Sequence, residues 1–65
     1  MHLILNGQHR DLEQIVTIQD LLCVLQLAGR LAVEINGQII ARSHYAEHAL
    51  QDGDHIEIVH AIGGG

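Results

Sequence analysis

Hydrophobic and polar positions alternate at the start of the chain and are interrupted by an Asn-Gly pair. The segment HLILNGQHR, residues 2–10, predicts a strand, a tight turn and a returning strand, because Asn and Gly accept the positive backbone angles of a two-residue hairpin loop. The same pattern returns in AVEINGQIIA, residues 32–41. The first strand of this second segment places Glu34 on one face and apolar side chains on the other: Leu31, Val33 and Ile35. The sequence therefore predicts two hairpins.

A helical period separates the two predicted hairpins. Thr17, followed three residues later by Asp20, is typical of a capping box at the start of a helix. Apolar side chains then recur with the spacing of one helical face: Ile18, Leu21, Leu22, Leu25 and Ala28. We expect Gly29 to end this amphipathic helix, because glycine takes the left-handed conformation without a side-chain clash.

The last third of the chain predicts a short turn and one more strand. SHYAEHAL, residues 43–50, is typical of a single helical turn, and QDGD after it is typical of a tight turn. HIEIVHA, residues 55–61, alternates, with its two isoleucines on one face and Glu57 and Val59 on the other. A sheet with one apolar face and one helix to cover it predicts an α+β fold, in which the helix lies across a mixed sheet of about five strands. This arrangement is the β-grasp, or ubiquitin-like, fold.

The glycines at positions 63–65 stand apart from this pattern. We expect residues 1–62 to form the β-grasp domain and residues 63–65 to form a flexible tail, because three glycines cannot pack a core. Three extended residues at about 3.3 Å each reach roughly 10 Å, and a tail without side chains fits a narrow channel. The tail therefore predicts a terminal carboxylate presented to a partner, with a cloning remnant or fraying as the alternative.

The charge of the chain excludes several classes of partner. Eight acidic residues against three arginines, with no lysine, give a formal net charge of −5, which repels nucleic acid and anionic membrane surfaces. The apolar runs fall far short of the roughly 18 to 20 residues that span a bilayer. Cys23 is the single cysteine, so an internal disulfide is impossible. Without a signal-peptide pattern, the expected location is cytoplasmic.

Few side chains indicate internal catalysis or a metal site. No Ser-His-acid set has a family-specific spacing, and a chain of 65 residues is too short for a deep catalytic pocket. Cys23 falls on the Gln19/Gln26 row of the predicted helix, and we interpret it as a structural or incidental thiol. His44 and His48 lie four residues apart, but two imidazoles make an incomplete zinc site. We therefore expect surface histidines, no metal and no catalytic residue.

Four acidic residues toward the end of the chain have two interpretations. They form turns or a solvated face, or they form a docking surface for a basic partner: Glu47, Asp52, Asp54 and Glu57. The exposed face of the sheet is the natural candidate for docking, because partners must recognise a domain with few other features.

Several segments of the chain, taken together, resemble one family. They are LNGQ in the first hairpin, the capped leucine-rich helix, VEINGQIIARSHY, and LQDGDHIEIVHAIGGG at residues 50–65. In this order the sequence is similar to the ThiS family of thiamine-pathway sulfur carriers, within the MoaD/ThiS group of ubiquitin-like proteins. The minimal pattern of the family is a glycine pair, and Gly63 makes it a triplet here.

The resemblance implies a carrier and not an enzyme. The modified group would be the carboxylate of Gly65, with Gly63 and Gly64 threading into partner active sites. A ThiF-like enzyme would adenylate this carboxylate with ATP and magnesium, and a sulfur-relay desulfurase would supply the sulfur of a thiocarboxylate. A ThiG-like thiazole synthase would accept that sulfur for the thiazole ring of thiamine. The chain itself would bind no cofactor.

Three other interpretations stay open at this point. The small subunit of molybdopterin synthase uses the same fold and a thiocarboxylate, although such chains look longer and tend to carry prolines before the glycine pair. A protein-conjugating modifier is a second alternative, although without lysine this chain could not extend chains through its own side-chain amines. A β-grasp interaction module with an inert tail is the third.

Overall fold

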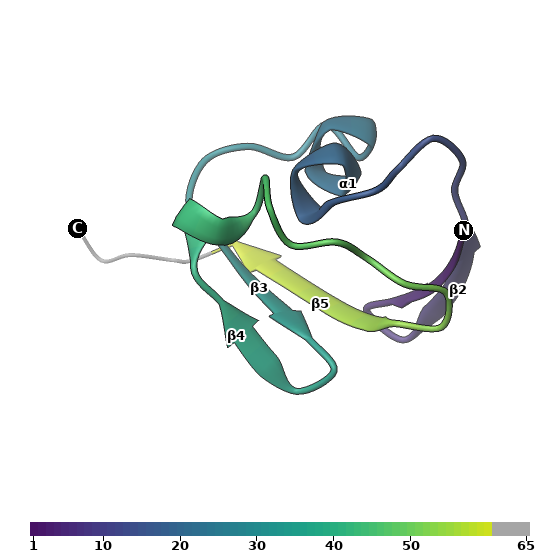
Figure 1. The fold of residues 1–65 in the computed structure, drawn as a ribbon. Helices are drawn as coiled ribbons and strands as arrows, with labels where there is room; N and C mark the ends of the chain where they lie inside the picture. The colour runs from purple at the N-terminus through teal and green to yellow at the C-terminus, as the bar shows by residue number, and fades with distance from the viewer. Residues whose placement is uncertain (61–65) are drawn as a thin grey trace.

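The computed structural model describes residues 1–60, which fold into a sheet with one helix across its face (Figure 1). The elements are β1 (His2–Leu5), β2 (Gln8–Asp11), α1 (Ile18–Val24), β3 (Leu31–Ile35), β4 (Gln38–Ile40), the 3₁₀ turn η1 (Arg42–His44) and β5 (His55–His60). The described residues form a five-stranded sheet in the order β2-β1-β5-β3-β4. This confirms the predicted β-grasp fold, whereas the expected boundary after residue 62 and the tail at 63–65 lie outside the described residues.

Both predicted hairpins are confirmed, and each closes on its Asn-Gly pair. Asn6 and Gly7 have φ of 48° and 82°, and Asn36 and Gly37 have φ of 50° and 88°. Positive φ at both central residues matches the right-handed twist of the flanking strands, and Asn and Gly tolerate it best. The β1/β2 and β3/β4 registers follow from these turns.

The last strand lies in the middle of the sheet. β5 pairs parallel with β1 on one side, through Ile4↔His55 and Leu5↔Ile56. It pairs antiparallel with β3 on the other side, from Ile35↔Ile56 to Leu31↔His60. The first and last strands of the described chain therefore adjoin, and the helix and second hairpin form the crossover between them.

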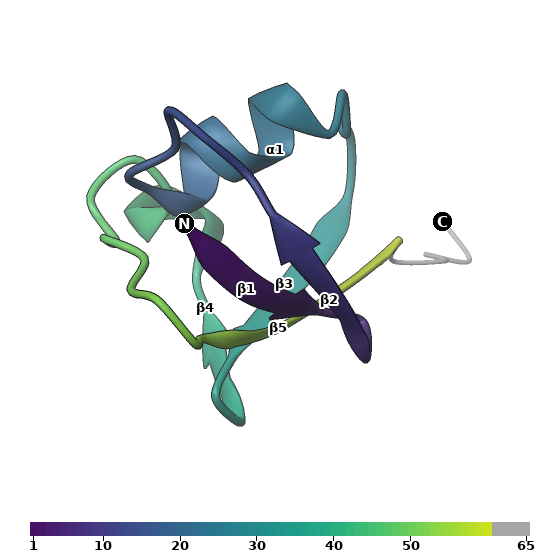
Figure 2. The same cartoon turned by 90° about the vertical axis from the view of Figure 1, so that its right-hand side faces the viewer.

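The core lies between the sheet and α1, which Figure 2 shows above it. Its buried side chains are Leu3, Leu5, Ile15, Ile18, Leu21, Leu22, Val33, Ile35, Tyr45, Leu50, Ile56 and Ile58. The alternation predicted for the last strand is confirmed, because Ile56 and Ile58 are buried while Val59 is 57% exposed. The apolar face of the sheet thus meets the apolar stripe of the helix.

The predicted helix start is confirmed in detail. The hydroxyl oxygen of Thr17 accepts a hydrogen bond from the Asp20 amide at 3.2 Å. The Asp20 carboxylate accepts from the amides of Val16 at 2.9 Å and Thr17 at 3.1 Å. These two backbone hydrogen bonds hold the pKa of Asp20 below its ordinary value of 3.8, because they favour the ionised carboxylate.

The predicted helix end at Gly29 is wrong, because α1 ends at Val24. Gln26 takes the left-handed conformation with φ of 56° and its amide donates to the Cys23 carbonyl, while the Leu27 amide donates to the Leu22 carbonyl at 2.9 Å. This is a Schellman motif, in which the apolar residue after the left-handed position packs back on the helix. Leu27 packs against the core in this way. Ala28, expected on the helical face, is exposed beyond it.

The region after the second hairpin forms a short turn, as predicted, although η1 begins one residue early, at Arg42. Tyr45 follows η1, is buried, and donates its hydroxyl hydrogen to the Leu31 carbonyl at 3.4 Å. Within residues 1–60, no helix is long and apolar enough to cross a membrane.

Candidate functional site

The strand that leads to the predicted tail is held by a turn residue of the first hairpin. The Asn6 side-chain oxygen accepts from the Ile58 amide at 2.9 Å, and its side-chain nitrogen donates to the Ile58 carbonyl at 3.2 Å. The Asn6 amide itself donates to the Ile56 carbonyl at 2.8 Å. Asn6 therefore continues the pairing of β1 with β5 beyond the end of β1, a role that its turn position alone did not indicate.

The second hairpin holds the start of the same strand. The Asn36 side-chain oxygen accepts from the His55 amide at 2.9 Å, and its side-chain nitrogen donates to the Asp54 carboxylate at 2.9 Å. The Asn36 amide donates to the His55 carbonyl at 2.8 Å. Each Asn-Gly turn thus closes its own hairpin and also fixes β5, so local and long-range structure depend on the same residue.

The site residues predicted from the sequence, Gly63, Gly64 and Gly65, lie outside the described residues. What the described chain contributes is their attachment point. β5 stays in register with β3 as far as Leu31↔His60, so pairing continues to the last residue of the strand. A segment that follows His60 therefore starts from the central strand of the sheet, where β3 pairs with His60 on one side and Asn6 holds Ile58 on the other.

An apolar and acidic patch covers the face of the sheet opposite α1. We call it the outer-face patch, and its members are Ala32, Glu34, Ile39, Glu57 and Val59, which surround a shallow hollow of about 200 Å³. Their neighbours along the strands point into the core, so these side chains point outward. Ile39 is 78% exposed and Val59 57% exposed. This patch joins three strands that include β5.

Two like charges lie side by side within the outer-face patch. Glu34 of β3 is directly opposite Glu57 of β5, and Ile39 of β4 is directly opposite Glu34. Directly opposed side chains have Cβ atoms about 4.5–5.5 Å apart, and like charges at that distance destabilise a sheet. Neither glutamate forms a salt bridge within the described residues. The pair therefore suits a partner that brings basic groups beside an apolar surface.

Of the other acidic residues weighed from the sequence, two accept hydrogen bonds from backbone amides. The Asp52 carboxylate accepts from the His2 amide at 2.8 Å, and the Asp54 carboxylate accepts from the Gln51 amide at 2.9 Å. Glu47 is exposed. The interpretation as a turn former is confirmed for Asp54, the carboxylate of Asp52 ties this turn to β1, and Glu57 belongs to the outer-face patch.

Comparison with known proteins decides the family. The model of the ThiS family matches residues 3–65. This chain belongs to the ThiS family. It is 36% identical to the sulfur carrier protein ThiS of Escherichia coli (strain K12) over 66 aligned residues, which cover 100% of both chains. The crystal structure of the thiamine biosynthesis protein ThiS from Geobacter metallireducens matches with a TM-score of 0.87 at 29% identity, over 100% of each chain.

A second kind of relative is larger than this ThiS-family chain. A thiazole synthase of Paramagnetospirillum magneticum (strain ATCC 700264 / AMB-1) is 44% identical over 66 aligned residues, covering 100% of this chain and 20% of the relative. The chain thus spans about a fifth of the length of the thiazole synthases that it matches.

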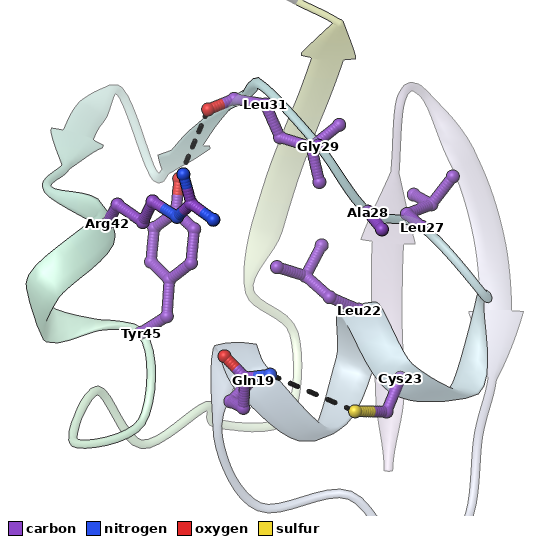
Figure 3. Close-up of a pocket in the computed structure, with 9 residues that line it drawn as sticks. All are labelled: Gln19, Leu22, Cys23, Leu27, Ala28, Gly29, Leu31, Arg42 and Tyr45. Atoms are coloured by element: carbon purple, nitrogen blue, oxygen red, sulfur yellow. Dashed lines mark hydrogen bonds between the residues drawn. The ribbon is translucent and has the colours of Figure 1, made fainter.

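The cysteine of this ThiS-family chain lies on the wall of a pocket of about 250 Å³, between α1, the loop after it and η1 (Figure 3). Arg42 and Cys23 lie on opposite sides of this pocket in Figure 3. The Gln19 side-chain nitrogen lies 3.9 Å from the Cys23 sulfur, whereas Gln26, placed on the same helical row from the sequence, lies beyond the helix end. An amide does not act as a general base, so this geometry agrees with an incidental thiol.

The histidines weighed from the sequence differ from those that the structure pairs. His44 and His48 lie within one turn, because the His48 amide donates to the His44 carbonyl at 2.9 Å. Residues 1–60 contain no group of three or more His, Cys, Asp or Glu side chains placed to hold a metal ion. The fold instead brings His2 and His9 together, with 2.9 Å between ring nitrogens. Their cross-strand positions in the first hairpin were the signal that sequence reasoning missed.

Proposed function

We propose that this chain carries sulfur for thiamine biosynthesis on the carboxylate of Gly65. The observation that carries the proposal is the family match, which runs to residue 65, together with whole-chain alignment to a sulfur carrier protein ThiS. The fold agrees with this role, because the central strand β5 ends at His60, five residues before Gly65 in the sequence. Gly63 and Gly64 would thread into the active sites of partner enzymes.

The chemistry of a carboxylate explains why a carrier needs partners. Displacement at a carboxylate carbon would expel oxide, so a ThiF-like enzyme would first use ATP and magnesium to form the acyl adenylate, releasing pyrophosphate. A persulfide formed by the desulfurase would then displace AMP to give an acyl disulfide, and a thiol would reduce this disulfide to release the thiocarboxylate, leaving a second disulfide on the sulfur donor. Each step takes place in the active site of another protein, and ATP and magnesium would bind there.

Thiazole synthase is the proposed acceptor. A segment similar to this whole chain occurs within proteins named thiazole synthase, which supports a ThiG-like partner, since the two functions then share one polypeptide. The relatives named sulfur carrier protein ThiS favour thiamine biosynthesis over molybdopterin synthesis, which the sequence left open. A cytoplasmic location remains the expectation that the single cysteine gives.

The folded body must supply most of the docking energy. Ordering each glycine of the tail costs on the order of 1 to 2 kcal/mol, so the tail alone would bind weakly. The outer-face patch offers exposed apolar surface beside the opposed Glu34 and Glu57. We therefore infer that the partners dock there through an apolar contact flanked by arginine or lysine.

The test is intact-mass analysis after incubation with a ThiF-like enzyme, ATP, magnesium and a sulfur source, followed by fragmentation. We expect a sulfur-for-oxygen mass shift confined to the fragment that contains Gly65. Oxidation of Met1 or Cys23 adds nearly the same mass, so localisation of the shift is essential. The matched control is Cys23→Ser, an exposed position whose replacement should leave the shift in place.

Two results would overturn the carrier proposal. One is an unmodified tail when the same activating enzyme modifies another carrier. The other is a variant without Gly64 and Gly65 that stays folded and still supports thiazole formation, because an interaction module tolerates this truncation and a carrier does not.

A further inference from the structure

Three side chains form a cluster on the first hairpin that the proposed carrier function does not use. The His2 Nε2 atom lies 2.9 Å from the His9 Nδ1 atom, and the two ring centroids are 5.0 Å apart at an interplanar angle of 27°. The His2 Nδ1 atom lies 3.6 Å from an Asp11 carboxylate oxygen. Because His2 pairs with Asp11 and Ile4 pairs with His9, all three side chains share the outer face of the hairpin.

The Asp11 carboxylate lies beside the first ring, 3.6 Å from its Nδ1 atom. Asp11 favours a hydrogen on the Nδ1 atom of His2, which leaves the Nε2 lone pair directed toward His9. In that tautomer of His2, His9 would donate its Nδ1 hydrogen across the 2.9 Å contact. If the hydrogen of His9 moves to its own Nε2 atom, the two facing nitrogens each hold a lone pair. A metal ion can then bind both without net proton release once the rings turn so that the lone pairs converge beside the line that joins the nitrogens.

We propose that His2 and His9 form a two-imidazole site for a divalent transition metal, with Asp11 as the carboxylate that orients His2. A carboxylate behind a ligating histidine is the usual arrangement at protein metal sites, where it fixes the tautomer and raises the basicity of the ring. This pair is different from the His44/His48 pair considered from the sequence.

The nitrogen separation selects the metal. Metal–imidazole distances of about 2.0–2.1 Å place two ligands at a right angle about 2.9 Å apart, and two tetrahedral ligands about 3.3 Å apart. The observed 2.9 Å, itself an ordinary hydrogen-bond distance, is also the separation that the right angle of tetragonal Cu²⁺ or Ni²⁺ requires. Water would complete the coordination, since no third ligand from the described residues is in place. Cu²⁺ binds nitrogen ligands most tightly in the divalent series, so it is the probe.

The test is a Cu²⁺ titration of the full chain near neutral pH, followed by nuclear magnetic resonance spectroscopy. Paramagnetic broadening should be centred on the β1/β2 hairpin at a stoichiometry of one. We expect His9→Ala to weaken this binding at least tenfold and Asp11→Asn to weaken it about tenfold, as for other orienting carboxylates. All three residues are on the surface, so an unchanged amide spectrum elsewhere should confirm that the variants are folded.

His44→Ala is the matched control and should leave the hairpin site unchanged. Three results would overturn the proposal: broadening centred on His44 and His48, broadening at Met1 and His2 that persists in His9→Ala, or no broadening at all. The second result would assign the metal to the amino terminus, whose nitrogen donates to the Leu12 carbonyl at 2.7 Å. None of these results bears on the sulfur-carrier proposal.

Discussion

The hydrogen bonds from the Asn6 side chain to β5 give a prediction whose size follows from the structure. Replacing Asn6 with glycine keeps the positive φ of the turn and removes both side-chain hydrogen bonds to Ile58. Each bond contributes about 0.5–1.5 kcal/mol, so Asn6→Gly should lower the free energy of unfolding by about 1–3 kcal/mol. Asn6→Ala loses the same bonds and keeps a Cβ atom in the left-handed region, a cost of roughly 1–2 kcal/mol that glycine avoids, so it should be the less stable variant.

These losses are large for a domain of this size. At about 0.05–0.15 kcal/mol per residue, a chain of 65 residues has a total stability of roughly 3–10 kcal/mol. Urea denaturation followed by circular dichroism should therefore separate wild type, Asn6→Gly and Asn6→Ala, in that order of stability. Hydrogen exchange adds a local readout, because the Ile58 amide loses its acceptor in both variants and should exchange faster.

Asn36→Gly is the matched control. This variant removes the equivalent turn side chain of the second hairpin. The hydrogen bonds of Asn36 to His55 and Asp54 are exposed to solvent, so water replaces them at little cost. The reasoning is refuted if Asn6→Gly and Asn36→Gly have the same effect, or if the Ile58 amide keeps its wild-type protection in Asn6→Gly.

Four further predictions follow from single residues. Asp20→Asn should be less stable than wild type near neutral pH and equally stable in strong acid, as thermal melts across pH would show. Because the pKa of Asp20 is lowered in the folded state, its stabilisation is complete above the unfolded-state pKa and is lost as the pH falls through the folded-state pKa. Ile39→Ser should weaken binding to a ThiF-like enzyme about tenfold or more in calorimetry, whereas Val24→Ser, also exposed but on α1, should not. Leu21→Ala should lower the free energy of unfolding by about 2–5 kcal/mol in urea, because Leu21 of α1 is fully buried in the core between α1 and the sheet. Gln26→Gly should raise the melting temperature by relieving about 1 kcal/mol at the left-handed helix end, and a lowered melting temperature would contradict the Schellman assignment.

The candidate site was only partly predictable from the sequence. The glycines were found because a run without side chains is visible in the sequence itself, and they lie outside the described residues. The sequence predicted the exposed face of the sheet as a docking surface. That Glu34 lies opposite Glu57 on this face could be known only from the register between β3 and β5. The pairing of His2 with His9 required the register of β1 and β2 in the same way.

Local chemistry was enough where a short segment decides its own conformation. Two Asn-Gly pairs determined two hairpins, Thr17 and Asp20 determined the helix start, and the alternation around Ile56 and Ile58 determined which face of the last strand is buried. The physical reason is that turn angles, caps and side-chain period depend on neighbours within about four residues. These features were sufficient to infer the β-grasp fold.

Tertiary structure alone decided features that depend on distant contacts. The helix ends at Val24 because this end lets Leu27 pack against the core. The gain from burying Leu27 outweighs the strain of a left-handed Gln26, and Gly29 then lies in the following loop. The carboxamide of Asn6 meets Ile58 only because β5 inserts beside β1. Propensity assigns an element to each segment, whereas packing between segments far apart in the sequence selects where elements end and which side chains meet.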